Sequence, residues 1–241
     1  MTRHFLIAAF ALAMATTLHA ADTPNTLTNQ ERADGWKLLF DGTTTTGWRG
    51  YKKDVAPDAW KVVDGALTLG DKRAGDLLSV DEYENFEFAF EWKISPNGNA
   101  GVFYLVQEKP ELQNTYNSGP EYQVLDNVGH PDAKNGPDRF AGANYALQAP
   151  TKDTSKAVGQ WNQSRIVKNG PHVEHWLNGE KVVDYELWSD AWKAQVAASK
   201  FKAMPAYGTA KKGFLALQDH GNPVWFRSLK IKVLPATKGT N

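Results

Sequence analysis

The sequence predicts an all-β protein, and three observations carry this prediction. Apolar and polar residues alternate without a break from Phe86 to Ile94, which is the pattern of a strand with one buried face. The dipeptide Asp64-Gly65 stands between two short apolar runs, as expected for the two-residue turn of a β-hairpin. Only one stretch, 189–201, shows helical spacing behind a serine cap. About a dozen strands and one short helix are therefore expected.

The remaining elements follow in chain order from the same signals. Residues 127–160 are rich in glycine and proline, and loops of this length are usually functional or disordered. Strands are expected at 36–40, 60–63, 66–69, 76–80, 86–94, 101–106, from 121 onward, and at 161–168, 173–177, 181–185, 213–219 and 225–234. The predicted core consists of the apolar members of alternating strands, including Phe88, Phe90, Trp92, Ile166 and Leu217.

The two ends of the chain are set apart from the predicted domain. A basic start, an apolar run over 5–18 and the small-residue sequence 18–20 are typical of a secretory signal peptide, 1–20, cleaved after Ala20. The apolar run is too short to span a bilayer comfortably, so no membrane insertion is expected after cleavage. The rest divides into a polar N-terminal segment, 21–34, a single domain, 35–235, and a tail, 236–241. A periplasmic or secreted location follows.

The composition excludes several classes of protein. Because the chain has no cysteine, disulfides, thiolate metal sites and a cysteine nucleophile are ruled out. The 27 basic and 27 acidic residues balance, so no electrostatic field attracts nucleic acid or an anionic membrane. Nine tryptophans and eight tyrosines are enough to fill a core and also to stack against sugar rings.

Polar residues at alternate positions of two predicted strands indicate a polar site. Glu121 and Gln123 share one face of their strand, about 6.6 Å apart, because side chains two positions apart point the same way. Gln218 and His220 repeat this arrangement near the C-terminus. Arg165 lies on the polar face of a third strand. We expect these five side chains to converge on one concave face.

Five motifs follow one another along the chain. They are GWKLLFDG (35–42), GPEYQVLD (119–126), WN with RIV (161–167), HWLNG (175–179) and LQDHG with WFR (217–227). With these motifs the chain resembles the 3-keto-disaccharide hydrolase family over about residues 35–235. The family is also described as 3-keto-α-glucoside 1,2-lyase and 3-keto-2-hydroxyglucal hydratase, formerly a domain of unknown function. The resemblance implies a concanavalin-like or jelly-roll sandwich of two antiparallel sheets and an activity on 3-keto-glycosides. Ala100 departs from the serine expected between Asn99 and Gly101, which puts a backbone-supporting hydroxyl in doubt.

Such an activity requires a base, an acid and a group that stabilises negative charge. A ketone at C3 of a sugar acidifies the hydrogen on C2, so a base can remove it while the oxygen on C1 leaves. Water then adds across the enone, which gives net hydrolysis. Glu121 and His220 are the acid and base candidates in unassigned order, and Arg165 is the candidate for stabilising the enolate. Contacts to the sugar are expected from four further residues: Gln123, Gln218, Glu91 and Trp161.

Two other functions remain open from the residues alone. A lectin-like carbohydrate-binding module uses the same kind of sandwich without any chemistry, and a large separation of His220 from Glu121 favours that reading. A glycosidase acting on unoxidised glycans through two carboxylates ranks below it, with Glu121 and Glu91 as the available pair.

The sequence contains no convincing metal motif. His172 and His175 point to opposite faces of a strand, so they do not form a zinc pair. The spacing of Asp126, Asp132 and Asp138 is not that of a calcium loop. A divalent metal as cofactor, the identity of the sugar and the oligomeric state are left open.

Overall fold

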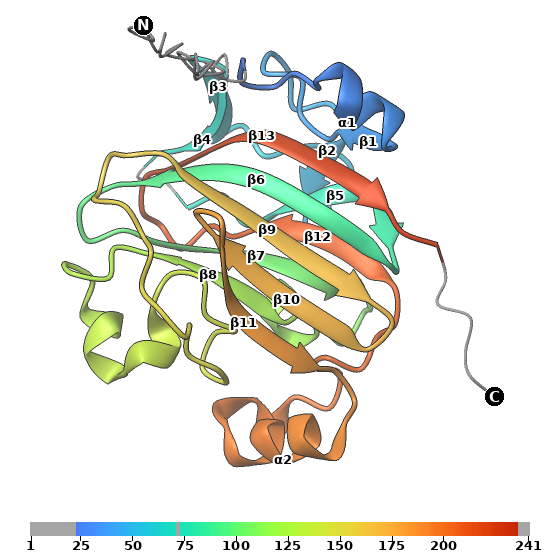
Figure 1. Ribbon diagram of the computed structural model, residues 1–241, viewed down its shortest axis with the longest axis vertical. Coiled ribbons are helices and arrows are strands. Elements are labelled where there is room, and N and C mark those ends of the chain that lie inside the picture. The colour runs from blue at the N-terminus through green and yellow to red at the C-terminus, as the bar shows by residue number, and fades with distance from the viewer. Residues whose placement is uncertain (1–22, 71–72, 236–241) are drawn as a thin grey trace, which may run out of the picture.

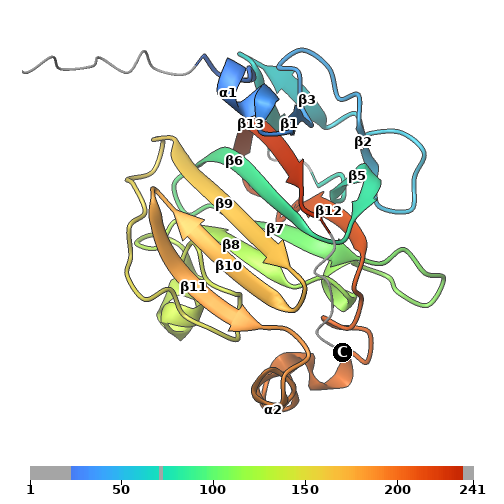
Figure 2. The same ribbon diagram turned by 45° about the vertical axis from the view of Figure 1, so that its right-hand side comes forward.

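The structure, a computed structural model, describes residues 23–70 and 73–235, so the predicted signal peptide and C-terminal tail lie outside the described residues. The described part contains thirteen strands in two antiparallel sheets that stack face to face (Figures 1 and 2). The predicted all-β sandwich of jelly-roll type is confirmed.

The larger sheet has eight strands, seven of them in the order β11-β10-β9-β6-β13-β4-β3, and β1 also pairs with β13. Its strands are β1 (Trp36–Leu38), β3 (Trp60–Val63), β4 (Ala66–Leu69), β6 (Phe86–Ile94), β9 (Asn162–Asn169), β10 (His172–Leu177), β11 (Glu180–Glu186) and β13 (Val224–Val233). The predicted hairpin turn joins β3 to β4. Asp64 and Gly65 have φ angles of 51° and 73°, the positive values that this two-residue turn requires.

The smaller sheet has five strands in the order β2-β5-β12-β7-β8. They are β2 (Trp48–Gly50), β5 (Leu77–Tyr83), β7 (Asn99–Val106), β8 (Glu121–Leu125) and β12 (Gly213–Leu217). Because consecutive strands such as β4, β5 and β6 alternate between the two sheets, segments far apart in sequence become neighbours.

The core lies between the two sheets and follows the predicted alternation. On β6 the residues at 86, 88, 90, 92 and 94 are all buried, and those between them are partly exposed. Each such apolar side chain contributes about 1.5–3 kcal/mol by leaving water. The predicted core residues are confirmed as buried: Phe88, Phe90, Trp92, Ile166 and Leu217.

Tyr122 of β8 ties the smaller sheet to the larger one. Its ring meets that of Phe90 edge to face, with centroids 5.4 Å apart. Its hydroxyl lies 2.8 Å from Oγ of Ser164 on β9, and Trp92 Nε1 donates to the same oxygen at 2.8 Å. Since buried polar groups are costly without partners, these bonds fix which face of β8 turns inward.

Two α-helices lie outside the sandwich: α1 (Asn29–Ala33) and α2 (Asp190–Ala198). α2 begins at the predicted serine cap, where Ser189 Oγ accepts a hydrogen bond from Trp192 N. It ends earlier than predicted, because Ser199 is extended and starts a separate 3₁₀ turn, η4 (Lys200–Ala203). α1 was not predicted; its capping box at Thr28 and Glu31 stands in the segment read only as polar.

The long loop over 127–160 is ordered and runs along β8. It contains two 3₁₀ turns, η2 (Pro131–Asn135) and η3 (Pro137–Arg139), and a third, η1 (Thr115–Asn117), precedes β8. Backbone bonds join the loop to the edge of β8: Gln123 N donates to Ala143 O, and Tyr145 N donates to Glu121 O at 3.0 Å. The loop thus provides hydrogen-bond partners for the backbone groups at the edge of β8 and brings its own side chains beside Glu121.

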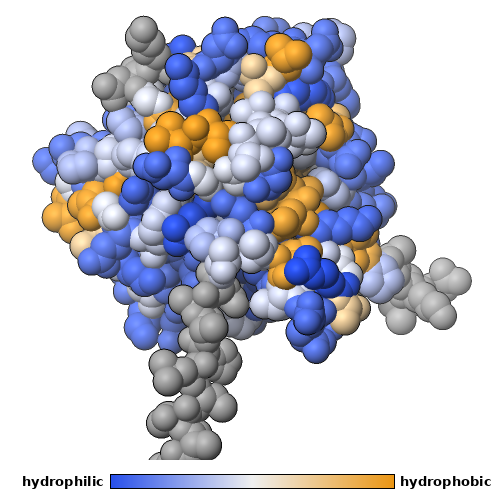
Figure 3. All heavy atoms as spheres, turned by 90° about the horizontal axis from the view of Figure 1, so that it is seen from above, coloured by the Kyte–Doolittle hydropathy of each residue, from blue (hydrophilic) through white to orange (hydrophobic). Residues whose placement is uncertain are grey.

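The surface seen from above is mostly hydrophilic, with small separate apolar patches (Figure 3). Across residues 23–70 and 73–235, no helix has the length and apolar character needed to cross a membrane.

Candidate active site

A cavity of about 280 Å³ opens on the face of the five-stranded sheet that is turned away from the core. Ligand pockets usually have volumes of about 300–1,000 Å³, so this cavity suits one sugar-sized group. Four of the predicted site residues line it: Glu121, Gln123, Gln218 and His220. The other lining residues are Asn99, Tyr116, Tyr145, Lys200, Phe201 and Met204.

Glu121 and Gln123 point into the cavity because Tyr122 and Val124 occupy the core. Gly101 of β7 makes room for the acid. A Cβ at Gly101 would lie 2.1 Å from Oε1 of Glu121, far inside van der Waals contact. The carboxyl group therefore lies directly over the backbone of β7.

Burial makes Glu121 a weak acid. The residue is only 5% exposed, and burial raises the pKa of its carboxyl from 4.5 to about 8. The positive charge of Lys200 opposes this rise, whereas Asp76 and Asp132 add to it. Among the described residues, no group donates a hydrogen bond to the carboxyl that would favour its charged form. Most molecules therefore carry the neutral acid at pH 7.

Lys200 supplies a cation on the wall of the cavity. Its ammonium lies 4.1 Å from the centre of the Tyr145 ring, within the range of a cation–π contact. The Tyr145 hydroxyl donates to Asp132 at 2.9 Å, which holds the ring in place. Burial lowers the pKa of Lys200, and the negative charge of Glu121 opposes this decrease. The amino group is thus held near the buried acid.

Gln218 and His220 are placed by a reciprocal clasp between Asp76, just before β5, and Asp219, just after β12. Asp76 Oδ1 accepts from the backbone N–H of Asp219 at 2.8 Å. Asp219 in turn accepts from the backbone N–H groups of Ala74 and Gly75. Because each carboxylate binds the backbone beside the other, the turn carrying the two cavity residues is fixed to β5.

The environment of His220 favours the neutral imidazole. Burial lowers its pKa from 6.5, a hydrogen bond with Asn222 opposes this, and the nearby His130 and Arg73 add to the decrease. Nε2 of His220 lies 3.4 Å from Nδ2 of Asn99, and the His130 ring lies 6.0 Å away, centroid to centroid. His220 can therefore accept a proton at neutral pH.

Two buried polar atoms of the cavity residues have no hydrogen-bond partner in the described part of the chain. They are Nε2 of Gln123, a donor, and Oε1 of Gln218, an acceptor. A buried polar atom without a partner costs about 1–3 kcal/mol. A ligand with several hydroxyl groups can serve both atoms, since a hydroxyl donates and accepts.

The expectation that Arg165, Glu91 and Trp161 lie in the same site is wrong. Arg165 follows a buried Ser164 and precedes a buried Ile166 on β9, so it points away from the core on the outer face of the eight-stranded sheet. There it pairs with Glu87 at 2.9 Å.

Glu91 lies on β6 of that sheet, and Trp161 comes directly before β9. Glu91 pairs with Arg227 at 2.6 Å, and the Arg227 guanidinium lies 4.0 Å from the centre of a Trp161 ring. The alternation identified polar faces correctly for Glu91 and Arg165 but did not tell which sheet each face belongs to. Glu91 and Glu121 therefore belong to different sheets, which removes the pair needed for a two-carboxylate glycosidase.

Several lining residues were not predicted. Lys200 stands in the 3₁₀ turn that follows α2, where the sequence predicted that the helix continues, and Tyr145 stands in the long loop, which has no periodic pattern. Asn99 was noticed only as part of the Asn-Ala-Gly motif. Its neighbour Ala100 is buried in the core, so the missing hydroxyl does not face the cavity.

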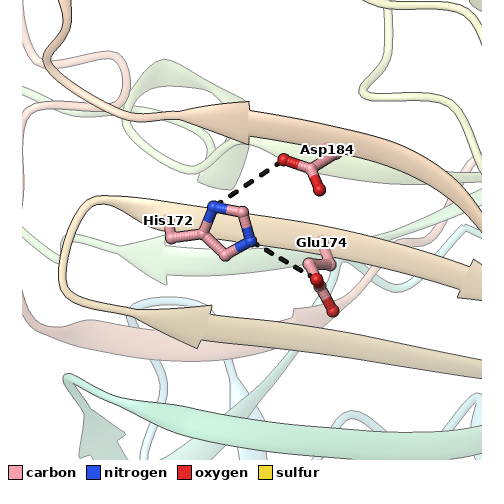
Figure 4. A group of neighbouring side chains, drawn as sticks. All are labelled: His172, Glu174 and Asp184. Carbon is pink, nitrogen blue, oxygen red and sulfur yellow. Dashed lines mark hydrogen bonds and ion pairs between the residues drawn. The ribbon is translucent and has the colours of Figure 1, made fainter.

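Within the described residues, the one group of three ligand-type side chains that could hold a metal ion is His172, Glu174 and Asp184 (Figure 4). It lies on β10 and β11 of the larger sheet. Lys181 already supplies a positive charge there, with Nζ 3.1 Å from Glu174 and 2.5 Å from Asp184. His175, in contrast, is fully buried and bonds to Gly142 O at 3.0 Å.

Comparison with known proteins identifies the family. The family described as a 3-keto-alpha-glucoside-1,2-lyase-like domain matches residues 35–232. The chain belongs to this family. The matched range includes Glu121, Gln218 and His220.

Other relatives of this family member carry related descriptions. A protein of Bacteroides thetaiotaomicron named 3-keto-disaccharide hydrolase is 40% identical over 230 residues, which covers 84% of this chain and 79% of the relative. A solved structure from Parabacteroides distasonis, described as a candidate glycosyl hydrolase, has a TM-score of 0.83 at 36% identity, covering 88% of this chain and all of that one. A second such structure from the same organism has a TM-score of 0.66 at 27% identity, covering 83% and 99%.

Proposed function

We propose that this protein hydrolyses 3-keto-glycosides by elimination followed by hydration. One observation carries the proposal: a neutral carboxylic acid, Glu121, and a neutral imidazole, His220, line the same cavity, with their pKa values shifted in opposite directions. Two titratable groups whose pKa values are pushed apart are typical of an acid and a base in one active site. The family membership and the named relative support the substrate class.

In the first step His220 removes the hydrogen on C2 of the keto sugar. Its neutral ring carries a lone pair at pH 7, and the C3 ketone makes this hydrogen acidic enough for an imidazole. Negative charge develops on the C3 oxygen, where the Lys200 amino group stabilises it. Lys200 takes the role first expected of Arg165, because it is a cationic group that lines the cavity.

In the second step the bond between C1 and the glycosidic oxygen breaks as a C1–C2 double bond forms. Glu121 gives its proton to the departing oxygen, since its pKa of about 8 keeps that proton available at pH 7. Water then adds to C1 of the enone and a proton returns to C2. The products are a free 3-keto sugar and the released alcohol, which together amount to hydrolysis.

A 3-keto-disaccharide and its unoxidised parent provide the test, with products followed by mass spectrometry. Only the keto form is expected to be cleaved, and deuterium on C2 should slow the reaction or exchange with solvent. Equal cleavage of both sugars without exchange at C2 contradicts the proposal. Binding of both sugars without cleavage favours a lectin-like module instead. A lectin has no need of a buried acid with a pKa of about 8, so we rank the enzyme first.

We also propose export to the periplasm or the medium, on the strength of the N-terminal pattern. The mass of the mature protein tests it: a chain that begins at Ala21 supports export, and an intact Met1 species in the membrane fraction contradicts it.

A further inference from the structure

A second cavity, of about 490 Å³, lies beside the first. The two share three lining residues: Tyr116, Gln218 and His220. Residues that line only the second cavity include Arg73, Asp76, Gln113, Asn114 and Asp219. Because the shared residues form a common wall, one ligand can extend from the first cavity into the second.

The second cavity is polar. The one cationic group among the described residues that line it, Arg73, already donates to the backbone oxygen of His220, and the amides on its walls offer neutral hydrogen-bonding groups to a ligand. Gln113 and Asn114 are exposed, and they precede and cap the η1 turn. The two carboxylates on its walls are engaged by the protein: Asp76 binds Thr115 and the Asp219 backbone, and Asp219 binds backbone N–H groups. Amides bind hydroxyl groups well, so this chemistry suits an uncharged, hydroxyl-rich ligand.

The shared wall contains the features that a ligand spanning both cavities requires. The buried Oε1 of Gln218 has no partner among the described residues, so it is available to a hydroxyl donor at the junction. The ring of Tyr116 is 39% exposed on the same wall and provides an apolar surface for a sugar ring. His220, the proposed base, borders both cavities, which places the bond to be broken close to their junction.

We propose that the second cavity binds the leaving group of the substrate, as a hydroxyl-rich, sugar-sized unit, while the keto ring occupies the first cavity. The inference rests on the proposed function and adds a preference that this function does not require. A 3-keto-glycoside with a second sugar as leaving group should be cleaved more efficiently than one with a small alkyl group.

The test compares a 3-keto-disaccharide with the methyl 3-keto-glycoside that has the same keto ring. For the wild-type protein, kcat/KM should be higher for the disaccharide. The double variant Gln113→Ala/Asn114→Ala removes two amides of the second cavity only, so the ratio of the two kcat/KM values should fall about tenfold or more. Both changes leave the backbone bonds of Gln113 and Asn114 to Asn117 in place.

Two further variants separate the inference from the proposed function. Gln123→Ala, in the first cavity, should lower kcat/KM for both substrates alike. Gln160→Ala, an exposed amide that lines neither cavity, should leave the ratio unchanged. Free glucose should also inhibit the wild-type protein competitively and inhibit the double variant less.

The outcomes are distinct. Suppose that the wild-type protein cleaves both keto substrates and that the double variant has kcat/KM values lowered equally for both, or not lowered at all. The second cavity then does not bind the leaving group, and the proposed function stands. If the wild-type protein cleaves neither substrate, the proposed function fails and the inference fails with it.

Discussion

Replacing the buried acid with its amide, Glu121→Gln, should stabilise the protein and impair its chemistry at the same time. The pKa of Glu121 is about 8 in the folded protein against an ordinary 4.5, so above pH 4.5 the unfolded chain releases a proton that the folded one keeps. Stability then falls with rising pH by about 1.4 kcal/mol per pH unit until about pH 8. At pH 7 the wild-type protein has therefore lost about 3 kcal/mol of its free energy of unfolding. The variant does not lose this stability, because its amide does not titrate.

Thermal unfolding of both proteins between pH 4 and pH 9 measures this effect. The melting temperatures should coincide near pH 4.5 and diverge as pH rises, with the variant higher by roughly 6–12 °C at pH 7 for a domain of this size. Glu180→Gln, at an exposed ion pair on β11, is the control and should show no such pH dependence. A difference in melting temperature that stays constant from pH 4 to pH 9, or a wild-type protein that is more stable than the variant at pH 7, refutes the assignment of Glu121 as a buried neutral acid.

The same variant should lower turnover by about 10²–10⁴-fold, because an amide gives no proton to the leaving oxygen. In the wild-type protein activity should fall as pH rises through about 8, where Glu121 loses its proton, and as pH falls below the lowered pKa of His220. Persistence of the alkaline decline in the variant contradicts the role of Glu121 as the acid.

Three further predictions follow from other contacts. Lys200→Ala should reduce turnover about 10²–10³-fold, while Arg165→Ala, on the other sheet, should leave turnover nearly unchanged. Equal losses of turnover in steady-state assays contradict the proposal that Lys200, and not Arg165, stabilises the enolate. Gly101→Ala should displace the carboxyl of Glu121 and cost about 10²-fold in turnover with an unchanged circular dichroism spectrum, and wild-type activity in this variant rules out the close approach. Burial lowers the pKa of His172, but hydrogen bonds to two glutamates raise this pKa overall. The charged imidazolium therefore stabilises the folded protein below pH 6.5, and this stabilisation is lost as pH rises through the pKa of His172 in the folded state. His172→Gln should therefore cost no more than about 1 kcal/mol at pH 5.5 and less at pH 8.5 in urea unfolding, and a reversed order argues against the ion pairs.

The sequence predicted the strands better than it predicted how they combine. Alternation on β6 identified Phe88 and Trp92 as core residues, because a period of two is a local property of the backbone. The same rule placed Glu121 and Arg165 on polar faces but could not separate them, since both a solvated face and a cavity wall are polar. Which sheet a strand joins depends on long-range pairing, and this has no local signature.

Lys200 shows a second limit of the sequence. It faces the cavity only because α2 stops at Ala198 and the chain turns at Ser199. The predicted helix over 189–201 runs through that point and would have directed the side chain elsewhere. A helix end shifted by a few residues is enough to hide a site residue, and helix ends are the least certain part of such a prediction.

The clasp between Asp76 and Asp219 has a consequence for laboratory evolution of this scaffold. Libraries built to change sugar preference concentrate on the turn that carries Gln218 and His220, yet part of what shapes that turn is encoded at the entrance of β5, 143 residues away along the chain. A substitution at Asp76 should lower activity in a screen as a substitution in the active site does, although Asp76 takes part in none of the proposed proton transfers. Randomising the two carboxylates together, or leaving both untouched, is therefore the better design.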